Sequence, residues 1–595
     1  MLNNTGRAER PGAPGSGPGG EALGRPPVPP MARVRSEVEA RAPHATLVDA
    51  LERAARLDAP FLTLHLGREP QVLDARGALE GAHRYAHALL GRGVGRGDRV
   101  LVMTPTSAAF VHAFLGTMLA GAIPVPLASP MTLGGVDRFL ANLTAVVEGS
   151  GARCLIASDR ILSALSDNRA LSQMVVESLC SDHAPPPPPR HGRHLPSLDA
   201  AQPAFIQYTS GTTGRPKGAV ISQRAVVANT FAIARSLSLR EDDVGASWLP
   251  LFHDMGLIGV VLTALCHRFP VHVTSPERFL MSPVNWLDLI AEHRATITAA
   301  PNFAYDLCVS RCRHDPGKLD SLRAVLNGAE PVQPDTLQRF DGRFGGFGFD
   351  SRSHTPVYGM AENTLAATFS DPRQAVQCLD LDRAALEQQG AAIDSSSRSA
   401  KQLVCVGSPV AGTSIAITGP EGRTLAEDRV GEVRIAGASL MDGYFQDDEA
   451  TEAAIEDGWL KTGDLGFVRD GRLYLTGRAK EVIIKGGRNI SPHDLEQAAE
   501  EVSGVVRGGV IAFGRPNRER GTDDVVVHAE TRERSEDARK LMTQTIVGGV
   551  LASQGVKVDE VVLRPPGSLA RTTSGKLRRS APTTPSTSDD GASTT

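Results

Sequence analysis

The sequence predicts an α/β protein with more than one domain. The chain has 595 residues, of which 41% are hydrophobic, so it can bury more than one large core. From Thr46 onward, short apolar segments alternate with amphipathic stretches. This alternation is typical of repeated βαβ units, in which helices cover the faces of parallel sheets.

Individual elements follow this pattern in chain order. Residues 99–103 read RVLVM and predict a strand, and the Thr-Pro-Thr-Ser segment after them is typical of a helix start. Phe110, Phe114 and Met118 then recur every fourth residue, as expected on one face of a helix. Further strands are predicted at residues 123–126, 154–157, 204–207, 271–274 and 322–326.

Both ends of the chain have compositions that disfavour a packed core. Residues 1–45 are rich in Gly, Pro and Arg and show no apolar period, which predicts a disordered extension. Met31 follows a Pro-rich run and is a second candidate for the first translated residue. Residues 581–595 are rich in Ser and Thr and are predicted to form a disordered tail.

Composition excludes several classes of protein. The chain carries 63 basic and 67 acidic residues, a formal charge of -4, so no strong overall field favours nucleic acid. The apolar stretches are shorter than the roughly 20 residues that span a membrane, and the N-terminus lacks a continuous apolar signal segment. Seven scattered cysteines do not suggest a disulfide framework. We expect a cytoplasmic protein.

The segment 208–218, YTSGTTGRPKG, directly follows a predicted strand and combines glycines, small hydroxyl residues and one lysine. Glycines let the backbone approach a ligand, hydroxyl and backbone N–H groups donate to phosphate oxygens, and Lys217 adds a positive charge. The spacing differs from the G-x-x-x-x-G-K-[ST] of a Walker A loop. The segment predicts a phosphate-binding loop, although a short Gly/Ser/Thr stretch taken alone is more often a flexible turn.

Five further motifs follow in chain order. They are Asn327-Gly-Ala-Glu330, Tyr358-Gly-Met-Ala-Glu362, Lys461-Thr-Gly-Asp464, Gly477-Arg478 and Arg571-Thr-Thr-Ser-Gly-Lys576. With the loop, they resemble the adenylate-forming superfamily of acyl-CoA synthetases, fatty acyl-AMP ligases, firefly luciferases and peptide-synthetase adenylation domains. The resemblance implies a large N-terminal adenylation domain over residues 46–478 and a small mobile C-terminal α/β domain over 479–580.

The resemblance also implies how ATP is bound in the cleft between the two domains. Asp464 would accept hydrogen bonds from the ribose hydroxyls, Arg478 would add a ribose contact, and Tyr358 would stack on adenine. The full set implied for ATP and AMP is Thr209, Ser210, Gly211, Thr212, Thr213, Gly214, Lys217, Asn327, Gly328, Ala329, Glu330, Tyr358, Gly359, Met360, Ala361, Asp464 and Arg478.

Catalytic and mobile positions are implied in the same way. Lys576 matches the catalytic lysine of the family, whose charge would stabilise negative charge on the α-phosphate. Glu362 would bind Mg²⁺ together with Thr213, because this cation prefers oxygen ligands. The resemblance adds Glu362 and His253 to the catalytic group and places the hinge at Lys480.

Residues 247–259, SWLPLFHDMGLIG, and 300–308, APNFAYDLC, resemble the fatty acyl-AMP ligase branch of this superfamily. The acyl pocket would be bordered by His253, Met255, Gly256 and Phe303. Residues 371–401 look like the extra segment of this branch, which would restrain the hinge and disfavour coenzyme A. That segment is also compatible with an ordinary surface loop.

The sequence therefore predicts ATP-dependent conversion of a medium- or long-chain fatty acid to acyl-AMP with release of pyrophosphate. The acyl group would then pass to the phosphopantetheine thiol of an acyl carrier protein. Coenzyme A is the alternative acceptor, because the residues after Gly487 and Ala570 depart from the branch pattern. An adenylation domain for amino acids stays open as well. So does a non-catalytic nucleotide-binding scaffold, against which Lys217, Glu362, Asp464 and Lys576 together argue.

Overall fold

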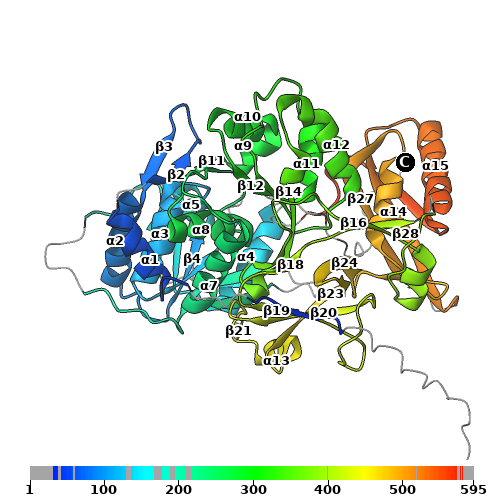
Figure 1. The fold of residues 1–595 in the computed structure, drawn as a ribbon. Helices are drawn as coiled ribbons and strands as arrows, with labels where there is room; N and C mark the ends of the chain where they lie inside the picture. The colour runs from blue at the N-terminus through cyan, green and yellow to red at the C-terminus, as the bar shows by residue number, and fades with distance from the viewer. Residues whose placement is uncertain are drawn as a thin grey trace, which may run out of the picture.

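The protein consists of a large body of sheets and helices with a smaller C-terminal α/β domain beside it (Figure 1). This arrangement confirms the predicted fold class. The computed structural model describes residues 31–37, 42–57, 60–128, 136–166, 177–187, 194–209, 216–397, 400–517, 519–571, 577 and 579. The expected extension before residue 31 and the expected tail after residue 580 lie outside the described residues.

A four-stranded parallel sheet in the order β5-β4-β6-β7 lies at one end of the body. Its strands are β4 (Arg99–Met103), β5 (Ile123–Pro126), β6 (Cys154–Ala157) and β7 (Glu177–Cys180). The helices around it are α2 (Ala75–Gly91), α3 (Ala108–Leu119), α4 (Val136–Ser150) and α5 (Asp159–Ser166). Helix α3 begins after Ser107, whose hydroxyl accepts a hydrogen bond from the Phe110 backbone N–H at 3.2 Å. The strands predicted at 99–103, 123–126 and 154–157 are confirmed.

A nine-stranded sheet forms the centre of the body, in the order β18-β15-β14-β13-β12-β10-β11-β2-β3. Its inner strands are parallel, which agrees with helices on both faces. They are β2 (Pro60–Leu64), β10 (Gly245–Ser247), β11 (Val271–Val273), β12 (Ile297–Ala300), β13 (Ala324–Asn327) and β14 (His354–Gly359). Antiparallel strands close its edges: β3 (Gln71–Asp74), β15 (Ala366–Phe369) and β18 (Ser408–Pro409).

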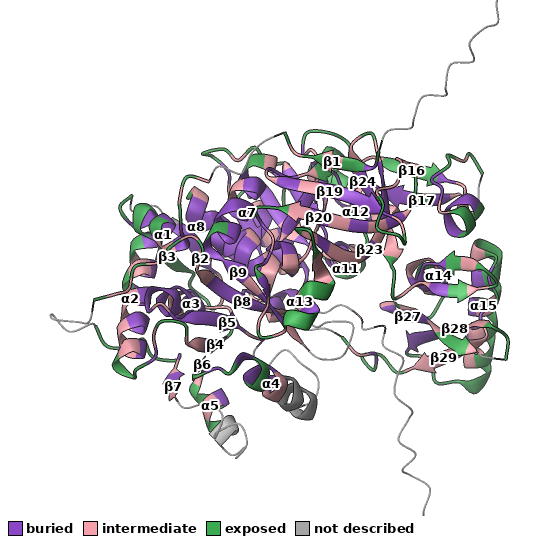
Figure 2. Ribbon diagram, turned by 90° about the horizontal axis from the view of Figure 1, so that it is seen from below, coloured by how far each residue is buried: buried purple, intermediate pink, exposed green. Residues whose placement is uncertain are grey.

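Helices connect these strands and cover the sheet. They are α1 (Leu47–Ala55), α7 (Gln223–Ser236), α8 (Thr263–His267), α9 (Pro276–Met281), α10 (Val284–Glu292), α11 (Asn302–Arg311) and α12 (Pro334–Phe344), with a π-helical segment at Met255–Leu262. Their buried residues and those of the strands belong to one large hydrophobic core. Buried residues dominate the interior of the body in Figure 2.

Two antiparallel sheets complete the body. A three-stranded sheet consists of β8 (Pro203–Thr209), β9 (Lys217–Ser222) and β21 (Gly443–Tyr444). A six-stranded sheet consists of β1 (Arg33–Arg35), β19 (Thr413–Thr418), β20 (Gly431–Gly437), β22 (Ile455–Glu456), β23 (Trp459–Arg469) and β24 (Arg472–Arg478). The short helix α13 (Asp448–Ala454) precedes β22.

Strand β1 corrects the expectation that residues 1–45 form a disordered extension. Arg33 pairs with Ala416 and Arg35 with Ser414 in an antiparallel ladder. The side chain of Ala32 is fully buried, and the Arg33 guanidinium lies 4.9 Å from the centroid of the Trp459 ring. Residues 31–37 are ordered despite their low apolar content, because β1 pairs with the edge of β19 and Ala32 is buried in the core.

The small domain has its own hydrophobic core, formed only by residues from Ile483 onward. Its elements are β25 (Ile483–Lys485), β26 (Arg488–Ile490), α14 (Pro492–Glu500), β27 (Val505–Asn517), β28 (Thr522–Thr531), α15 (Glu536–Gln554) and β29 (Glu560–Arg564). No helix among the described residues is long and apolar enough to cross a membrane.

The segment predicted to be an insertion, residues 371–401, forms a hairpin that contacts the small domain. Strand β16 (Cys378–Leu381) pairs with β17 (Lys401–Val404), and a π-helical turn lies at Ala385–Gln389. Asp494 of α14 forms ion pairs with Lys401 at 2.8 Å and Arg383 at 3.3 Å. Arg488 of β26 pairs with Glu387 at 2.7 Å. We call these five side chains the hairpin ion pairs.

Candidate active site

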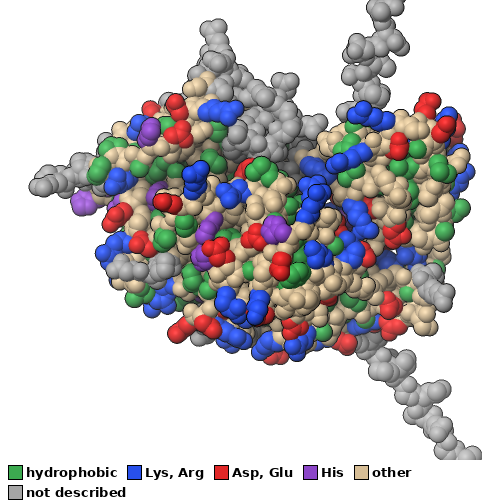
Figure 3. Space-filling view, turned by 90° about the horizontal axis from the view of Figure 1, so that it is seen from above, with side chains coloured by type: hydrophobic (Ala, Val, Ile, Leu, Met, Phe, Trp, Pro, Cys, Tyr) green, Lys and Arg blue, Asp and Glu red, His purple; other side chains and the backbone are tan. Residues whose placement is uncertain are grey.

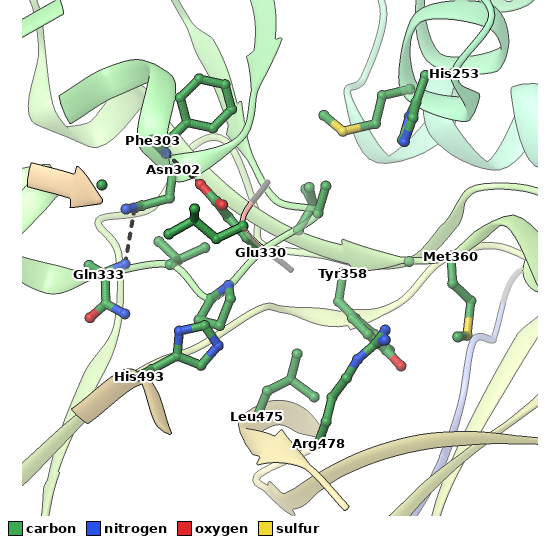
Figure 4. Close-up of a pocket in the computed structure, with 18 of the residues that line it drawn as sticks. His253, Asn302, Phe303, Glu330, Gln333, Tyr358, Met360, Leu475, Arg478 and His493 are labelled. Carbon is green, nitrogen blue, oxygen red and sulfur yellow. Dashed lines mark hydrogen bonds between the residues drawn. The ribbon is translucent and has the colours of Figure 1, made fainter. Parts of the chain in front are cut away.

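A cleft of about 3180 Å³ lies between the body and the small domain. The carboxyl ends of β12, β13 and β14 open into it, where ligands bind in sheets of this type. Strands β23 and β24 form a further wall, and α14 faces the body across the cleft. Figure 4 shows side chains from these separate elements, among them Phe303, Tyr358, Arg478 and His493, that line one pocket.

Three of the residues expected to bind the nucleoside are in direct contact. The Tyr358 hydroxyl donates to one carboxylate oxygen of Asp464 at 2.7 Å, and Arg478 Nε donates to the other at 2.8 Å. Strand pairing places Asp464 directly opposite Arg478. Asp464 is only 6% exposed, yet it lines the cleft. Because each oxygen of a carboxylate can accept more than one hydrogen bond, Asp464 can still receive the two hydroxyls of a ribose.

Two members of this trio have shifted pKa values. Burial and the neighbouring Asp464 carboxylate raise the pKa of Tyr358 well above its ordinary value. Attraction to Asp464 raises the pKa of Arg478. Tyr358 therefore stays a neutral phenol and Arg478 a charged guanidinium at neutral pH, and with Asp464 they form a polar edge beside the flat face of Tyr358.

The end of β13 is packed closely against β14. A Cβ on Gly328 would lie 2.8 Å from the Val357 carbonyl oxygen, so glycine is required there. Ala329 has a φ of 68°, a conformation that is costly for a residue with a side chain. Asn302 fixes the segment on both sides, because its side-chain oxygen accepts from Asn327 Nδ2 at 3.2 Å and from the Gln333 backbone N–H at 3.1 Å.

Glu330 contacts a neighbouring helix of the protein, whereas the sequence predicted a contact with nucleotide. Its Oε1 accepts a hydrogen bond of 2.5 Å from the Phe303 backbone N–H. This N–H lies in the first turn of α11, where a carboxylate also interacts favourably with the helix dipole. Glu330 thus joins the end of β13 to α11, and in this structure it positions the cleft wall; a contact with nucleotide remains a prediction.

A second polar group lies at the loop that follows β14. The Tyr444 hydroxyl donates to Glu362 Oε1 at 3.0 Å, and Lys217 Nζ lies 5.0 Å from the centroid of the Tyr444 ring. Burial raises the pKa of Glu362. The loop is closely packed, because a Cβ on Gly359 would lie 1.7 Å from the Leu365 carbonyl oxygen. Lys217 and Glu362, both expected at the phosphates, therefore flank one aromatic ring.

Sequence reasoning missed Tyr444. It lies in the two-residue strand β21, which pairs with β9 immediately after Lys217. No apolar period or spacing distinguishes this tyrosine from a partly buried aromatic residue. Only the pairing of β21 with β9 brings it between Lys217 and Glu362.

The residues expected to border an acyl chain lie on the other side of the cleft. Met255 opens the π-helical segment, and a Cβ on Gly256 would lie 2.2 Å from the Pro250 carbonyl oxygen. Phe303 packs edge-on against Trp248 with ring centroids 6.1 Å apart. His253 contacts the Asp254 carboxylate and lines the cleft. Apolar side chains extend this wall: Phe269, Val271, Leu280 and Leu307.

Several expected site residues cannot be placed. Ser210, Gly211, Thr212, Thr213, Gly214 and Lys576 lie outside the described residues. Thr209, at the end of β8, and Lys217, at the start of β9, border the cleft from both ends of that loop. Met360 and Ala361 also line the cleft, and Lys480 is exposed in the turn after β24.

Arg579, which follows Lys576 in the sequence, is anchored to the small domain. Arg579 donates to both carboxylate oxygens of Glu496, at 2.6 and 2.7 Å, and to Glu481 at 2.9 Å. Burial alone would raise the pKa of Glu496, but hydrogen bonds from Arg579 and His493 lower it to about 2. These contacts, which we call the Arg579 clamp, hold Arg579 against α14 and against the turn after β24.

Comparisons with known proteins agree with this geometry. A family model described as AMP-binding enzyme matches residues 53–445. A Caulobacter vibrioides protein with the provisional name of acyl-CoA synthetase is 33% identical over 503 residues, 83% of this chain and 87% of that protein. The medium-chain fatty-acid acyl-carrier-protein ligase JamA of Moorena producens is 31% identical over 515 residues, 82% of this chain and 85% of that protein.

A solved structure has the same fold. It comes from structural and functional studies of fatty acyl-adenylate ligases from E. coli and L. pneumophila. It superposes with a TM-score of 0.83 at 34% identity and covers 90% of this chain and 97% of that chain.

Proposed function

Because the chain belongs to the AMP-binding enzyme family, we propose that it activates a fatty acid with ATP and then passes the acyl group to the thiol of an acyl carrier protein. The observation that carries this proposal is the Tyr358–Asp464–Arg478 trio at the cleft wall. It offers a flat face and a charged acceptor side by side, which is the chemistry that a nucleoside requires.

In the first step, a carboxylate oxygen of the fatty acid attacks the α-phosphorus of ATP. A new P–O bond forms, the bond to the bridging oxygen of pyrophosphate breaks, and the products are acyl-AMP and pyrophosphate. No protein nucleophile is needed, so positioning and charge stabilisation supply the rate enhancement. Lys217 and Lys576 are the residues of this chain that would stabilise negative charge on the phosphates.

Glu362 fits a role in binding Mg²⁺. Its carboxyl group is largely buried beside the Tyr444 hydroxyl, and burial raises its pKa. A hard divalent cation would favour the charged form and offset that cost. When bound, Mg²⁺ supplies positive charge next to the phosphate oxygens.

The acyl side of the cleft supports a fatty substrate. Phe303 and Trp248 present aromatic surface, and Val271, Leu280 and Leu307 extend the apolar wall. No charged group of the kind that would pair with an amino-acid ammonium is needed for such a chain. The name of the Moorena relative, a medium-chain fatty-acid ligase, agrees with this assignment.

The choice of a carrier protein as acceptor rests on the hairpin ion pairs and on the relatives. The pairs join residues 371–401 to α14 and β26, which restrains rotation of the small domain about Lys480. In this conformation Lys485 of β25 binds Asp559 within the small domain at 2.7 Å. Basic side chains also gather where the two parts meet on the face seen in Figure 3, a surface suited to an acidic partner.

The experiment uses the full chain with ATP, Mg²⁺ and fatty acids of increasing length. Acyl-AMP, acyl-CoA and acyl-carrier products are then followed by mass spectrometry. We expect acyl-AMP that transfers to a phosphopantetheinylated carrier protein but not to coenzyme A. Efficient acyl-CoA formation would instead support the synthetase activity suggested by the name of the Caulobacter relative, and absence of any adenylate would refute the proposal.

A further inference from the structure

Three histidines that play no part in the proposed reaction meet on one side of the central sheet. His65 follows β2, His272 is the middle residue of β11, and His293 follows α10. One ring nitrogen of each lies within 4.8 Å of the ring nitrogens of the other two. We call this group the histidine cluster.

The fold brings the cluster together from distant parts of the sequence. Strands β2 and β11 are parallel neighbours, with His272 opposite Thr63. Paired residues and those two positions further along share a face of a sheet, so His65 and His272 lie on the same face. Helix α10 covers this face, since Trp286 Nε1 donates to Thr298 of β12 at 3.0 Å. His293 follows the last turn of that helix.

The contacts within the cluster are those of neutral imidazoles. His65 Nε2 lies 3.0 Å from His272 Nδ1, so one ring donates and the other accepts. The His272 and His293 rings stack with centroids 3.7 Å apart. The ordinary pKa of an imidazole is about 6.5, so neutral rings with lone pairs available for a ligand are the main form above neutral pH.

One polar atom of the cluster has no hydrogen-bond partner. His293 Nε2 is buried and makes no hydrogen bond to any residue that the structure describes. A buried polar atom without a partner destabilises the folded protein. A ligand that accepts lone pairs from the three rings would provide the missing interaction. The exposed Glu292 carboxylate lies 3.9 Å from His293 Nε2.

We propose that His65, His272 and His293 form a binding site for a borderline transition-metal ion of the Zn²⁺ class, which would join β2, β11 and the end of α10. Neutral imidazole nitrogens suit Zn²⁺, Cu²⁺ and Ni²⁺, whereas Mg²⁺ selects oxygen ligands. The Mg²⁺ proposed for the reaction would thus not compete for this site. Three histidines would fill three of the four ligand positions of a tetrahedral Zn²⁺ site and leave the fourth for water or Glu292.

The geometry requires a small adjustment. Zn–N bonds of about 2.0–2.1 Å in a tetrahedral site place ligand nitrogens about 3.3 Å apart. The His65–His272 pair, at 3.0 Å, is already near this spacing. The stacked His272 and His293 rings are nearly parallel, with planes 5° apart, so one must tilt to aim its lone pair at the same ion. The proton between His65 and His272 would move to the outward-facing nitrogen of the ring that donates it, so that both inner nitrogens offer a lone pair.

The test uses the full chain without a histidine tag, treated with a chelator and titrated with Zn²⁺ in buffer that contains millimolar Mg²⁺. Calorimetry should show one tight equivalent of Zn²⁺ that is lost in His272→Ala and in His293→Gln. The control His314→Ala removes a histidine that is exposed and outside the cluster, and it should bind Zn²⁺ as the parent protein does.

Two further measurements separate a metal site from a structural histidine contact. Co²⁺ should give the visible absorption of a tetrahedral nitrogen site in the parent protein and not in the cluster variants. Zn²⁺ should raise the melting temperature of the parent protein and leave that of His272→Ala unchanged. If His272→Ala does not fold, His293→Gln gives the same information from the end of α10. Equal binding by parent and cluster variants, or no Zn²⁺ binding at all, would overturn the proposal.

Discussion

The groups that would bind the nucleoside and the groups that would hold the catalytic segment are organised differently. Tyr358, Asp464 and Arg478 lie in the body and bind one another directly. The Arg579 clamp lies in the small domain, and the hairpin ion pairs cross the boundary between the two parts. The contrast teaches that the proposed nucleoside-binding trio is preformed within the body, whereas the hairpin ion pairs that hold the small domain against the body are charged contacts that a domain movement would break.

Asp464→Ala should have the largest effect, because it removes the preformed acceptor. Hydrogen bonds to a charged group contribute about 1.5–3 kcal/mol each, so losing two ribose contacts should lower kcat/KM for ATP by more than about 100-fold. ATP–pyrophosphate exchange measures this. The control Asp442→Ala removes a carboxylate whose partner, Arg224, is exposed, and it should leave exchange within about twofold of the parent. A loss below about tenfold for Asp464→Ala would contradict a preformed nucleoside site.

Arg579→Ala should affect the small domain and not the trio of Tyr358, Asp464 and Arg478 in the body. It leaves the buried Glu496 carboxylate without its cation, which costs about 3–5 kcal/mol. We expect kcat for adenylation to fall by about tenfold with KM for ATP nearly unchanged, because the nucleoside trio is intact. Arg515→Ala, which removes an exposed ion pair of the same domain, is the matched control.

The stability of the small domain should depend on pH differently in Arg579→Ala and in the parent protein. The pKa of Glu496 is about 2 in the folded parent protein, below its ordinary value of 4.5. The clamp therefore stabilises the domain above pH 4.5, and this stability is lost as pH falls toward 2. Without Arg579 the pKa of Glu496 should rise, so acid unfolding of the small domain should begin at a higher pH than in the parent protein. Hydrogen exchange of the backbone amides within α14 would measure the pH at which this unfolding begins.

Asp494→Ala tests the contacts that cross the boundary. It leaves Lys401 and Arg383 without the carboxylate that they share, which should loosen the small domain without altering the nucleoside site. We expect the rate of acyl-AMP formation to stay within about twofold, while transfer to coenzyme A rises by about threefold or more. Glu421→Ala, which removes an exposed pair with Arg423, serves as the control. Unchanged coenzyme A use would argue that the hairpin does not restrain the domain.

Glu500→Gln should have the smallest effect, and its direction depends on pH. Burial, with Glu496 and Asp306 nearby, raises the pKa of Glu500 from 4.5 to about 7. The folded protein then binds more protons than the unfolded chain between these two values, so this group lowers stability as pH rises through that window. Glutamine keeps the acceptor for the Gly508 N–H and avoids the charge. Thermal unfolding should show a gain of about 1–2 kcal/mol at about pH 8 and little change at about pH 5.

Much of this organisation could be predicted from the sequence, because it depends on local pattern. The strands at 99–103, 123–126 and 154–157 are short apolar segments with turn residues at their ends, and their bounds match. The strand predicted at 322–326 instead spans 324–327, because Leu322 packs in the core from the turn before it. The first and last residues of a strand depend on its pairing with neighbouring strands. The apolar period of one segment carries no information about that pairing.

The contacts that set the site depend on tertiary structure. Asp464 and Arg478 come from predicted motifs, but their direct pairing follows from the β23–β24 register. Tyr444 meets Glu362 across 82 residues of sequence, and His65 meets His272 across 207. Nothing in either local segment indicates such a partner. The same holds for β1, whose composition alone predicted disorder.

Strand β1 also governs how the N-terminus can be altered. It covers one side of β19, whose other side is paired with β20. A truncated protein that begins at Thr46 would uncover that strand edge and the space filled by Ala32, and an exposed edge is a template for pairing with another chain. Such a truncation should self-associate at concentrations where the full chain does not. A fusion partner joined ahead of Met31 keeps the edge covered.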